Sequence, residues 1–187
     1  SQLASIIGAI ENTGLKRFAV CQHIDGSDWK AVKEERREII DFLIDYAMKN
    51  PEMEVVTEQL YDDGVYLLQR VAEHEPELAV EMEKLLARQG GCPAGDRIVN
   101  VDYRGNVHLC PYWQYRTIGN IREQKLSDIC FDEEDEILAM MKDKTQHLKG
   151  KCGRCMHKHL CRGCGARAEE MCGDLFGTDP ACYLTEE

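Results

Sequence analysis

Residues 150–183 read GKCGRCMHKHLCRGCGARAEEMCGDLFGTDPACY and contain six of the ten cysteines of the chain. The motif Cys-x-x-Cys occurs twice in this stretch, and five residues separate the two copies. One such step brings two sulfurs to a single metal ion or cluster, and two steps with outlying cysteines can build a closed thiolate cage. Because few apolar residues accompany the cysteines, we expect bound metal to hold this part of the chain together.

Composition limits what a chain of 187 residues can be. Its formal net charge is -11, whereas a nucleic-acid-binding surface is basic. No apolar run approaches the ~20 residues of a membrane span, and no charged-then-apolar leader is seen at Ser1. We therefore expect a cytoplasmic chain that binds neither nucleic acid nor membrane. Its cysteines are then expected to be ligands or catalysts and not disulfides.

Residues 1–89 alternate between helix and strand patterns. The apolar spacing predicts helices over 2–12, 32–48, 64–71 and 76–87 and strands over 16–22 and 53–57. This order indicates a parallel α/β unit. Two βα repeats complete neither a barrel nor a doubly wound sheet. The sequence therefore looks cut at its N-terminal edge, as though strands before Ser1 were missing.

Residues 90–187 have a different pattern. Apolar and polar side chains alternate on both sides of Arg104-Gly105, over 97–103 and 106–109, which predicts a β-hairpin. Beyond it we expect an aromatic connector over 112–119, short helices over 126–130 and 134–141, and loops after Lys151. The sequence thus predicts two domains, 1–89 of α/β class and 90–187 of α+β class.

The cysteines fall into two groups. Cys21 lies in an apolar strand and Cys130 at the end of a short helix, so we expect both to be small buried apolar residues. The other eight suit two four-cysteine iron–sulfur clusters, but they equally suit two zinc ions with four ligands each. Ligand softness does not separate these alternatives, because thiolate binds both. His157 and His159 lie between the Cys-x-x-Cys steps, and we expect them to be exposed loop residues.

The cysteine spacing resembles that of the SPASM domain, the C-terminal auxiliary-cluster module of many radical S-adenosylmethionine enzymes. The matching pattern is Cys92-x12-Gly105-x4-Cys110, then Cys152-x2-Cys155-x5-Cys161-x2-Cys164, then Cys182. The family has three residues between the last two cysteines of the central group, whereas this chain has only Arg162 and Gly163 there. The resemblance covers about residues 90–187.

Longer segments resemble a narrower group, the radical enzymes of the alternative haem and haem d1 pathways. They are DDGVYLLQRV at 62–71, VDYRGNVHLCPYW at 101–113, TIGNIREQKLSDI at 117–129 and GARAEEMCGDLFGTDPACYLTEE at 165–187. The enzymes of this group modify side chains of sirohaem-derived tetrapyrroles. A SPASM-type peptide or protein maturase is the alternative, because such enzymes share the cysteine module. A zinc-stabilised binding module is the third possibility.

The resemblance implies a longer enzyme. In the family, a partial (β/α)6 barrel precedes the module, and its CxxxCxxC loop holds the cluster that cleaves S-adenosylmethionine. That motif is absent from this sequence, and residues 1–89 resemble only the last βα units of the barrel. We therefore expect a C-terminal portion that generates no 5′-deoxyadenosyl radical alone. S-adenosylmethionine and a third [4Fe–4S] cluster would bind in the missing N-terminal part, and an electron donor such as ferredoxin or flavodoxin would supply electrons.

The resemblance also implies a ligand set for two auxiliary [4Fe–4S] clusters. By analogy, auxiliary cluster II is held by Cys152, Cys155, Cys161 and Cys182. Auxiliary cluster I is held by Cys92, Cys110 and Cys164. Counting alone, and no motif, suggests Cys172 as its fourth ligand, and the rival is an open iron site that contacts substrate.

Five further residues are candidates for contact with a tetrapyrrole, and none is identified as catalytic. Tyr112 and Trp113 can stack on a flat macrocycle, although they equally suit a cover that keeps water from a cluster. Arg116 can pair with substrate carboxylates or with loops and helix ends. His108 alternates with apolar residues on the hairpin and can approach an iron or a carboxylate. His23 follows a barrel-type strand, where α/β sites usually lie.

Overall fold

The N-terminal part of the computed structural model is built around two parallel strands. The structure describes residues 2–21, 29–58 and 61–184. The elements here are α1 (Gln2–Glu11), β1 (Arg17–Cys21), α2 (Trp29–Lys49), β2 (Glu54–Glu58), α3 (Asp62–Ala72) and α4 (Pro76–Gln89). β1 pairs with β2 in parallel, from Arg17 opposite Glu54 to Cys21 opposite Glu58. The predicted alternation of helices and strands is confirmed, with boundaries shifted by up to three residues.

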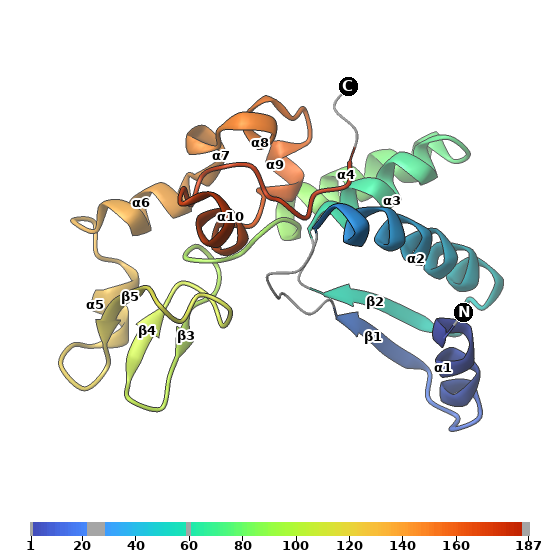
Figure 1. The fold of residues 1–187 in the computed structure, drawn as a ribbon, viewed down its shortest axis with the longest axis horizontal. Coiled ribbons are helices and arrows are strands. Elements are labelled where there is room, and N and C mark those ends of the chain that lie inside the picture. Colours follow the sequence, from blue (N-terminus) through green and yellow to red (C-terminus); the bar gives the residue numbers. More distant parts are fainter. Residues whose placement is uncertain (1, 22–28, 59–60, 185–187) are drawn as a thin grey trace.

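The helices α2, α3 and α4 lie on one side of these strands (Figure 1). The apolar stripe of α2 buries Ile40 and Leu43 against Val65 and Leu68 of α3, and Phe18 of β1 packs on the same core. Apolar residues in such a stripe recur every three to four positions, which is why the helix could be predicted from the sequence. The carboxyl end of β2 is thereby fixed beside the start of α3.

The second part contains a small antiparallel sheet. Its strands are β3 (Asn100–Val101), β4 (Asn106–His108) and β5 (Thr117–Asn120), in that order. The predicted hairpin is present but shorter, and β5 begins inside the stretch 112–119 that the sequence predicted to be a connector. The helix α5 (Leu126–Cys130) packs on β5, where a Cβ on Gly119 would stand only 2.8 Å from the Ile129 side chain.

The two predicted short helices are confirmed as α5 and α6 (Glu136–Lys142). Four more short helices follow them: α7 (Lys144–His147), α8 (Gly150–Arg154), α9 (Lys158–Cys161) and α10 (Gly165–Cys172). The part after Lys151, which the sequence predicted to be loops, is therefore partly helical. Helices this short bury too few residues to show an apolar period, so α8 and α9 could not be predicted from the sequence. In Figure 1 these two helices lie in the upper part of the view, beside α4.

The two parts of the chain meet through its last described residues. Leu160, Tyr183 and Leu184 belong to the same buried cluster as the helices of residues 1–89. The Tyr183 hydroxyl donates to a carboxylate oxygen of Asp63 over 2.8 Å, across 120 residues of sequence. A second core surrounds Trp113 in the other part. Residues 1–89 and 90–187 differ in sequence pattern, but side chains from both parts share one buried cluster. The domain boundary at residue 89 therefore stays a prediction.

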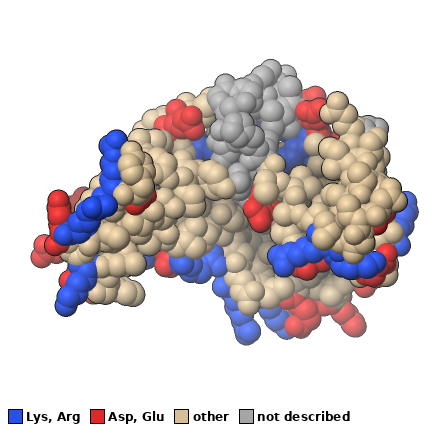
Figure 2. All heavy atoms as spheres, turned by 90° about the horizontal axis from the view of Figure 1, so that it is seen from below, with Lys and Arg blue, Asp and Glu red and all other residues tan. Residues whose placement is uncertain are grey.

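Two surface features complete the description. Among the described residues, no helix has the length and apolar character needed to cross a membrane. Figure 2 shows one face of the molecule, on which lysine and arginine side chains are interspersed with aspartate and glutamate.

Candidate metal centre

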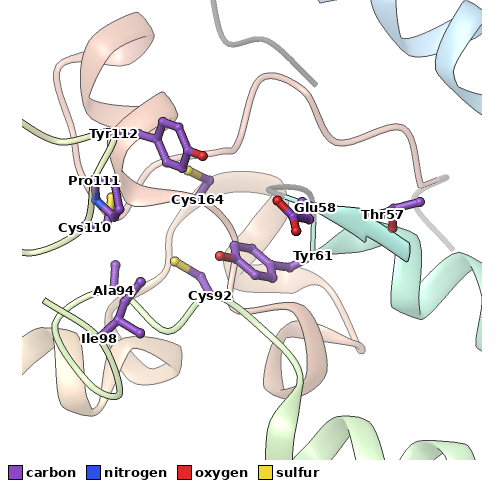
Figure 3. Close-up of a pocket in the computed structure, with 10 residues that line it drawn as sticks. All are labelled: Thr57, Glu58, Tyr61, Cys92, Ala94, Ile98, Cys110, Pro111, Tyr112 and Cys164. Atoms are coloured by element: carbon purple, nitrogen blue, oxygen red, sulfur yellow. The ribbon is translucent and has the colours of Figure 1, made fainter. Parts of the chain in front are cut away.

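A cavity of about 350 Å³ lies where the carboxyl end of β2 faces the cysteine-rich part. Three of its lining residues are Cys92, Cys110 and Cys164, which are far apart in sequence. Glu58 and Tyr61 line it from the N-terminal part. Figure 3 shows the sulfurs of Cys92 and Cys164 directed toward the space that Glu58 and Tyr61 also face.

Backbone hydrogen bonds fix two of these cysteines. The N–H of Cys92 donates to the carbonyl oxygen of Cys161 over 3.0 Å. The N–H of Cys164 donates to the carboxylate of Asp179 over 3.1 Å. Burial raises the pKa of Cys110 to about 11 and also raises the pKa of Cys164. Because the metal-binding form of cysteine is the thiolate, a metal bound here must displace these protons.

A second, smaller cavity is lined by the other four predicted ligands: Cys152, Cys155, Cys161 and Cys182. Cys152 lies in α8, and Cys155 caps the end of that helix. Cys161 is the last residue of α9, and Cys182 lies in the C-terminal segment. Burial raises the pKa of Cys182 to about 11, and it also raises the pKa values of Cys152 and Cys161. Three of the four cysteines predicted for auxiliary cluster I thus line one cavity, and the four predicted for auxiliary cluster II line another.

Asp179 connects the two cavities. Its backbone N–H donates to the sulfur of Cys152 over 3.3 Å, at the second cavity. Its carboxylate accepts the N–H of Cys164 at the first cavity and pairs with Arg167 through Nε at 2.8 Å and Nη2 at 2.5 Å. Asp179 is 4% and Arg167 1% exposed. Through these hydrogen bonds, the buried Asp179–Arg167 pair holds Cys164 at the first cavity and Cys152 at the second.

The remaining cysteines lie elsewhere. Cys172, the predicted fourth ligand, is exposed at the end of α10 and is not among the residues that line either cavity. The prediction that Cys21 is buried is wrong, because β1 alternates and Cys21 falls on its exposed face. Its thiol donates to Glu58 over 3.2 Å. Cys130 is half-buried, and all ten cysteines are free thiols.

The structure also shows where the two histidines between the Cys-x-x-Cys motifs lie. His159 is exposed as expected, whereas His157 is half-buried, with Nε2 3.3 Å from the side-chain nitrogen of Gln69. Among the described residues, no three histidine, cysteine or acidic side chains stand close enough together to hold a single metal ion.

Among the predicted substrate residues that the structure describes, only Tyr112 lines the first cavity, and it is half exposed. Trp113 is fully buried, and its indole N–H donates to Glu169 over 2.7 Å. Arg116 forms an ion pair with the same Glu169 and lies over the Trp113 ring. These contacts match the alternative roles of cover and structural pairing.

His108 is not among the residues that line the first cavity. His108 is 2% exposed, and its Nδ1 lies 2.8 Å from the carbonyl oxygen of Arg116. Its Nε2 lies 3.5 Å from Asp102. His108 therefore ties β4 to β5. His23 lies outside the described residues.

Sequence reasoning missed several residues at the cavities. Glu58 and Tyr61 reach the first cavity only through the fold, and burial raises the pKa of Tyr61 with the three nearby thiols adding to the effect. Asp179 and Arg167 lie within the segment that carried the resemblance, but nothing in their spacing marked them as a buried pair. Lys144 was not singled out in the sequence, and it is buried.

Comparisons with known proteins agree with this geometry. The model of the SPASM family, described as an iron–sulfur cluster-binding domain, matches residues 92–156. Fe-coproporphyrin III synthase of Methanosarcina barkeri is 35% identical over 162 residues, which are 82% of this chain and 41% of that protein. Pre-heme d1 synthase of Dinoroseobacter shibae is 30% identical over 198 residues, covering 99% of this chain and 49% of that protein.

A third relative, an AdoMet-dependent heme synthase of Methanosarcina barkeri, is 37% identical over 106 residues, 57% of this chain and 29% of that protein. No solved structure matches the chain significantly. The chain spans less than half the length of these relatives. The chain therefore contains a SPASM iron–sulfur cluster-binding domain and is similar to a portion of the synthases of Fe-coproporphyrin III, pre-heme d1 and heme named above.

Proposed function

We propose that this chain is the auxiliary-cluster portion of a radical S-adenosylmethionine enzyme that modifies side chains of a sirohaem-derived tetrapyrrole. The observation that carries the proposal is the sorting of seven predicted ligands into two cavities, three at one and four at the other. The names of the relatives, synthases of Fe-coproporphyrin III, pre-heme d1 and heme, support a tetrapyrrole as the substrate class.

In this proposal, each cavity holds one [4Fe–4S] cluster. Auxiliary cluster II has the four ligands of the second cavity, and auxiliary cluster I has Cys92, Cys110 and Cys164. The donor chemistry fits, because thiolates are the usual ligands of such clusters. The N–H of Asp179 directed at the Cys152 sulfur fits as well, because hydrogen bonds to the sulfurs are one of the means by which proteins adjust these centres. When bound, the clusters supply one-electron transfer.

The cavity that would hold auxiliary cluster I is lined by more than its three cysteines. Glu58 and Tyr61 present oxygen atoms to it, and Tyr112 supplies an aromatic face. Carboxylate, phenol and ring suit one edge of a tetrapyrrole, because flat conjugated groups stack on aromatic faces. Cys172 as the fourth ligand of auxiliary cluster I is a separate proposal.

Residues 1–89 are proposed to be the last βα units of a partial (β/α)6 barrel. The parallel β1–β2 pair with α2 as its crossover supports this, and Glu58 lies at the carboxyl end of β2, the end at which barrel sites form. S-adenosylmethionine and its cluster would bind to a part of the enzyme outside this chain. An electron donor of ferredoxin or flavodoxin type is proposed to reduce it.

Anaerobic reconstitution tests the proposal. The chain should bind about eight iron atoms and turn brown, and Cys152→Ala should lose about half of the iron because one cluster loses a ligand. A sirohaem derivative should change the spectrum of the reconstituted chain, whereas a peptide from a maturase substrate should not. Colourless protein that binds zinc would refute the cluster proposal, and a response to the peptide alone would refute the substrate class.

A further inference from the structure

Lys144 is a buried lysine with an unusual environment. Its side chain is 1% exposed, and its ammonium donates to the carbonyl oxygen of Gly163 over 2.9 Å. Within the described part of the chain, no carboxylate lies within ion-pair distance of this ammonium. Lysine is almost never fully buried unless its charge is paired, because a lone charge in a protein interior is costly. The site therefore calls for an anion.

The position of Lys144 is set by the peptide that joins the two cavities. Gly163 lines the second cavity, and the next residue, Cys164, lines the first. A Cβ on Gly163 would lie 3.4 Å from the sulfur of Cys152. Because Lys144 is bonded to this peptide, its charge lies beside both cysteine groups.

Other cations near the cysteines differ from Lys144. Arg167 forms an ion pair with Asp179. Lys151 and Lys158 line the second cavity, but both are only partly buried, and their ammonium groups donate to the carbonyl oxygens of Leu184 and Gly153. Lys144 is therefore a fully buried cation that lies beside both cysteine groups and has no described carboxylate within ion-pair distance.

We propose that Lys144 is the shared counter-ion of the two auxiliary clusters and raises the reduction potential of both. This inference rests on the proposed function, because the anions it requires are the thiolate-bound clusters. Each cluster becomes more negative when it takes up one electron, and a buried cation stabilises the reduced form more than the oxidised form. Lys144 thus makes both clusters easier to reduce.

The test uses Lys144→Met in the reconstituted chain, with dithionite as the electron source and reduction followed by electron paramagnetic resonance. We expect the reduction equilibrium constant of each cluster to fall at least about tenfold, which is 59 mV for a one-electron couple. Lys144→Arg should keep both potentials, because it keeps the charge. Lys149→Met is the matched control, since Lys149 is an exposed lysine paired with Asp174.

Lys144→Gln separates the charge from the hydrogen bond to Gly163, because the amide is neutral but still donates. Lower potentials in this variant support the proposal. Unchanged potentials at full iron content, or a shift at one cluster alone, overturn it. Loss of iron in both neutral variants but not in Lys144→Arg supports a requirement for charge, whereas loss in all three overturns it. Wild-type chain without iron would refute the proposed function itself.

Discussion

Replacing Asp179 with asparagine should destabilise the protein strongly. The change removes one charge from a buried ion pair and leaves Arg167, 1% exposed, without its carboxylate. Removing one partner of a buried pair costs about 3–5 kcal/mol, because the remaining charge stays desolvated. Domains of this kind have total stabilities of about 5–15 kcal/mol. The variant should therefore lose a large share of its stability.

Urea unfolding of the anaerobically reconstituted chain, followed by circular dichroism, measures this loss. With a slope of about 2 kcal/mol per molar urea, the midpoint should fall by about 2 M. Lys84→Met is the control, because it breaks the exposed Lys84–Glu81 pair at 2.7 Å, and such pairs contribute about 1 kcal/mol or less.

A double variant, Arg167→Met with Asp179→Asn, isolates the cause. It removes both charges but keeps an oxygen that can accept the N–H of Cys164. We expect it to recover about 2 kcal/mol relative to Asp179→Asn alone. If Asp179→Asn unfolds at the same urea concentration as Lys84→Met, the pair does not stabilise the fold, and the reasoning about a buried pair joining the cavities is wrong.

Three further predictions concern other parts of the chain. Gly91→Ala should lower the thermal midpoint more than Gly173→Ala: both glycines have φ +70, but a Cβ on Gly91 would stand 2.6 Å from a backbone oxygen, whereas Gly173 faces open space. Cys172→Ala should leave iron content unchanged, because the thiol is exposed; loss of one cluster's iron would instead establish it as a ligand. For Asp102, desolvation is outweighed by hydrogen bonds from the hairpin turn, which lower its pKa from 3.8 to about 2. Its contribution to stability is therefore present above about pH 4 and lost as the pH falls through 2, and Asp102→Asn should flatten that part of the pH–stability curve.

Local periodicity explains why so much of the N-terminal part could be predicted. The apolar stripe of α2 and the short apolar runs of β1 and β2 are visible in the sequence, because each repeats at the period of its own element. The strand β5 was missed because its pairing with β4 depends on a connection of eight residues between His108 and Thr117. The sequence carries no tight-turn residues that would mark such a pairing.

The candidate site divides in the same way. The cysteines could be chosen from their spacing, and the family resemblance grouped seven of them as the two cavities do. Glu58 and Tyr61 could not be chosen, because only the fold brings the end of β2 to the cysteines. The burial of Lys144 was equally invisible, since a lysine in a polar stretch normally indicates surface. Trp113 and Arg116 show the opposite case. Their side-chain types suited contact with a substrate, but in the structure both contact Glu169 of the same chain.

The hydrogen bond between Tyr183 and Asp63 has a consequence for biosynthesis. Asp63 is translated 120 residues before Tyr183. The helices of residues 1–89 therefore lack the Tyr183 hydrogen bond until the intervening residues have been translated. Cys182, beside Tyr183, completes the four-cysteine cavity at the same moment. Docking of Tyr183 and assembly of that four-cysteine site therefore both require translation through residue 183, and a scaffold protein that delivers iron would act only after that point.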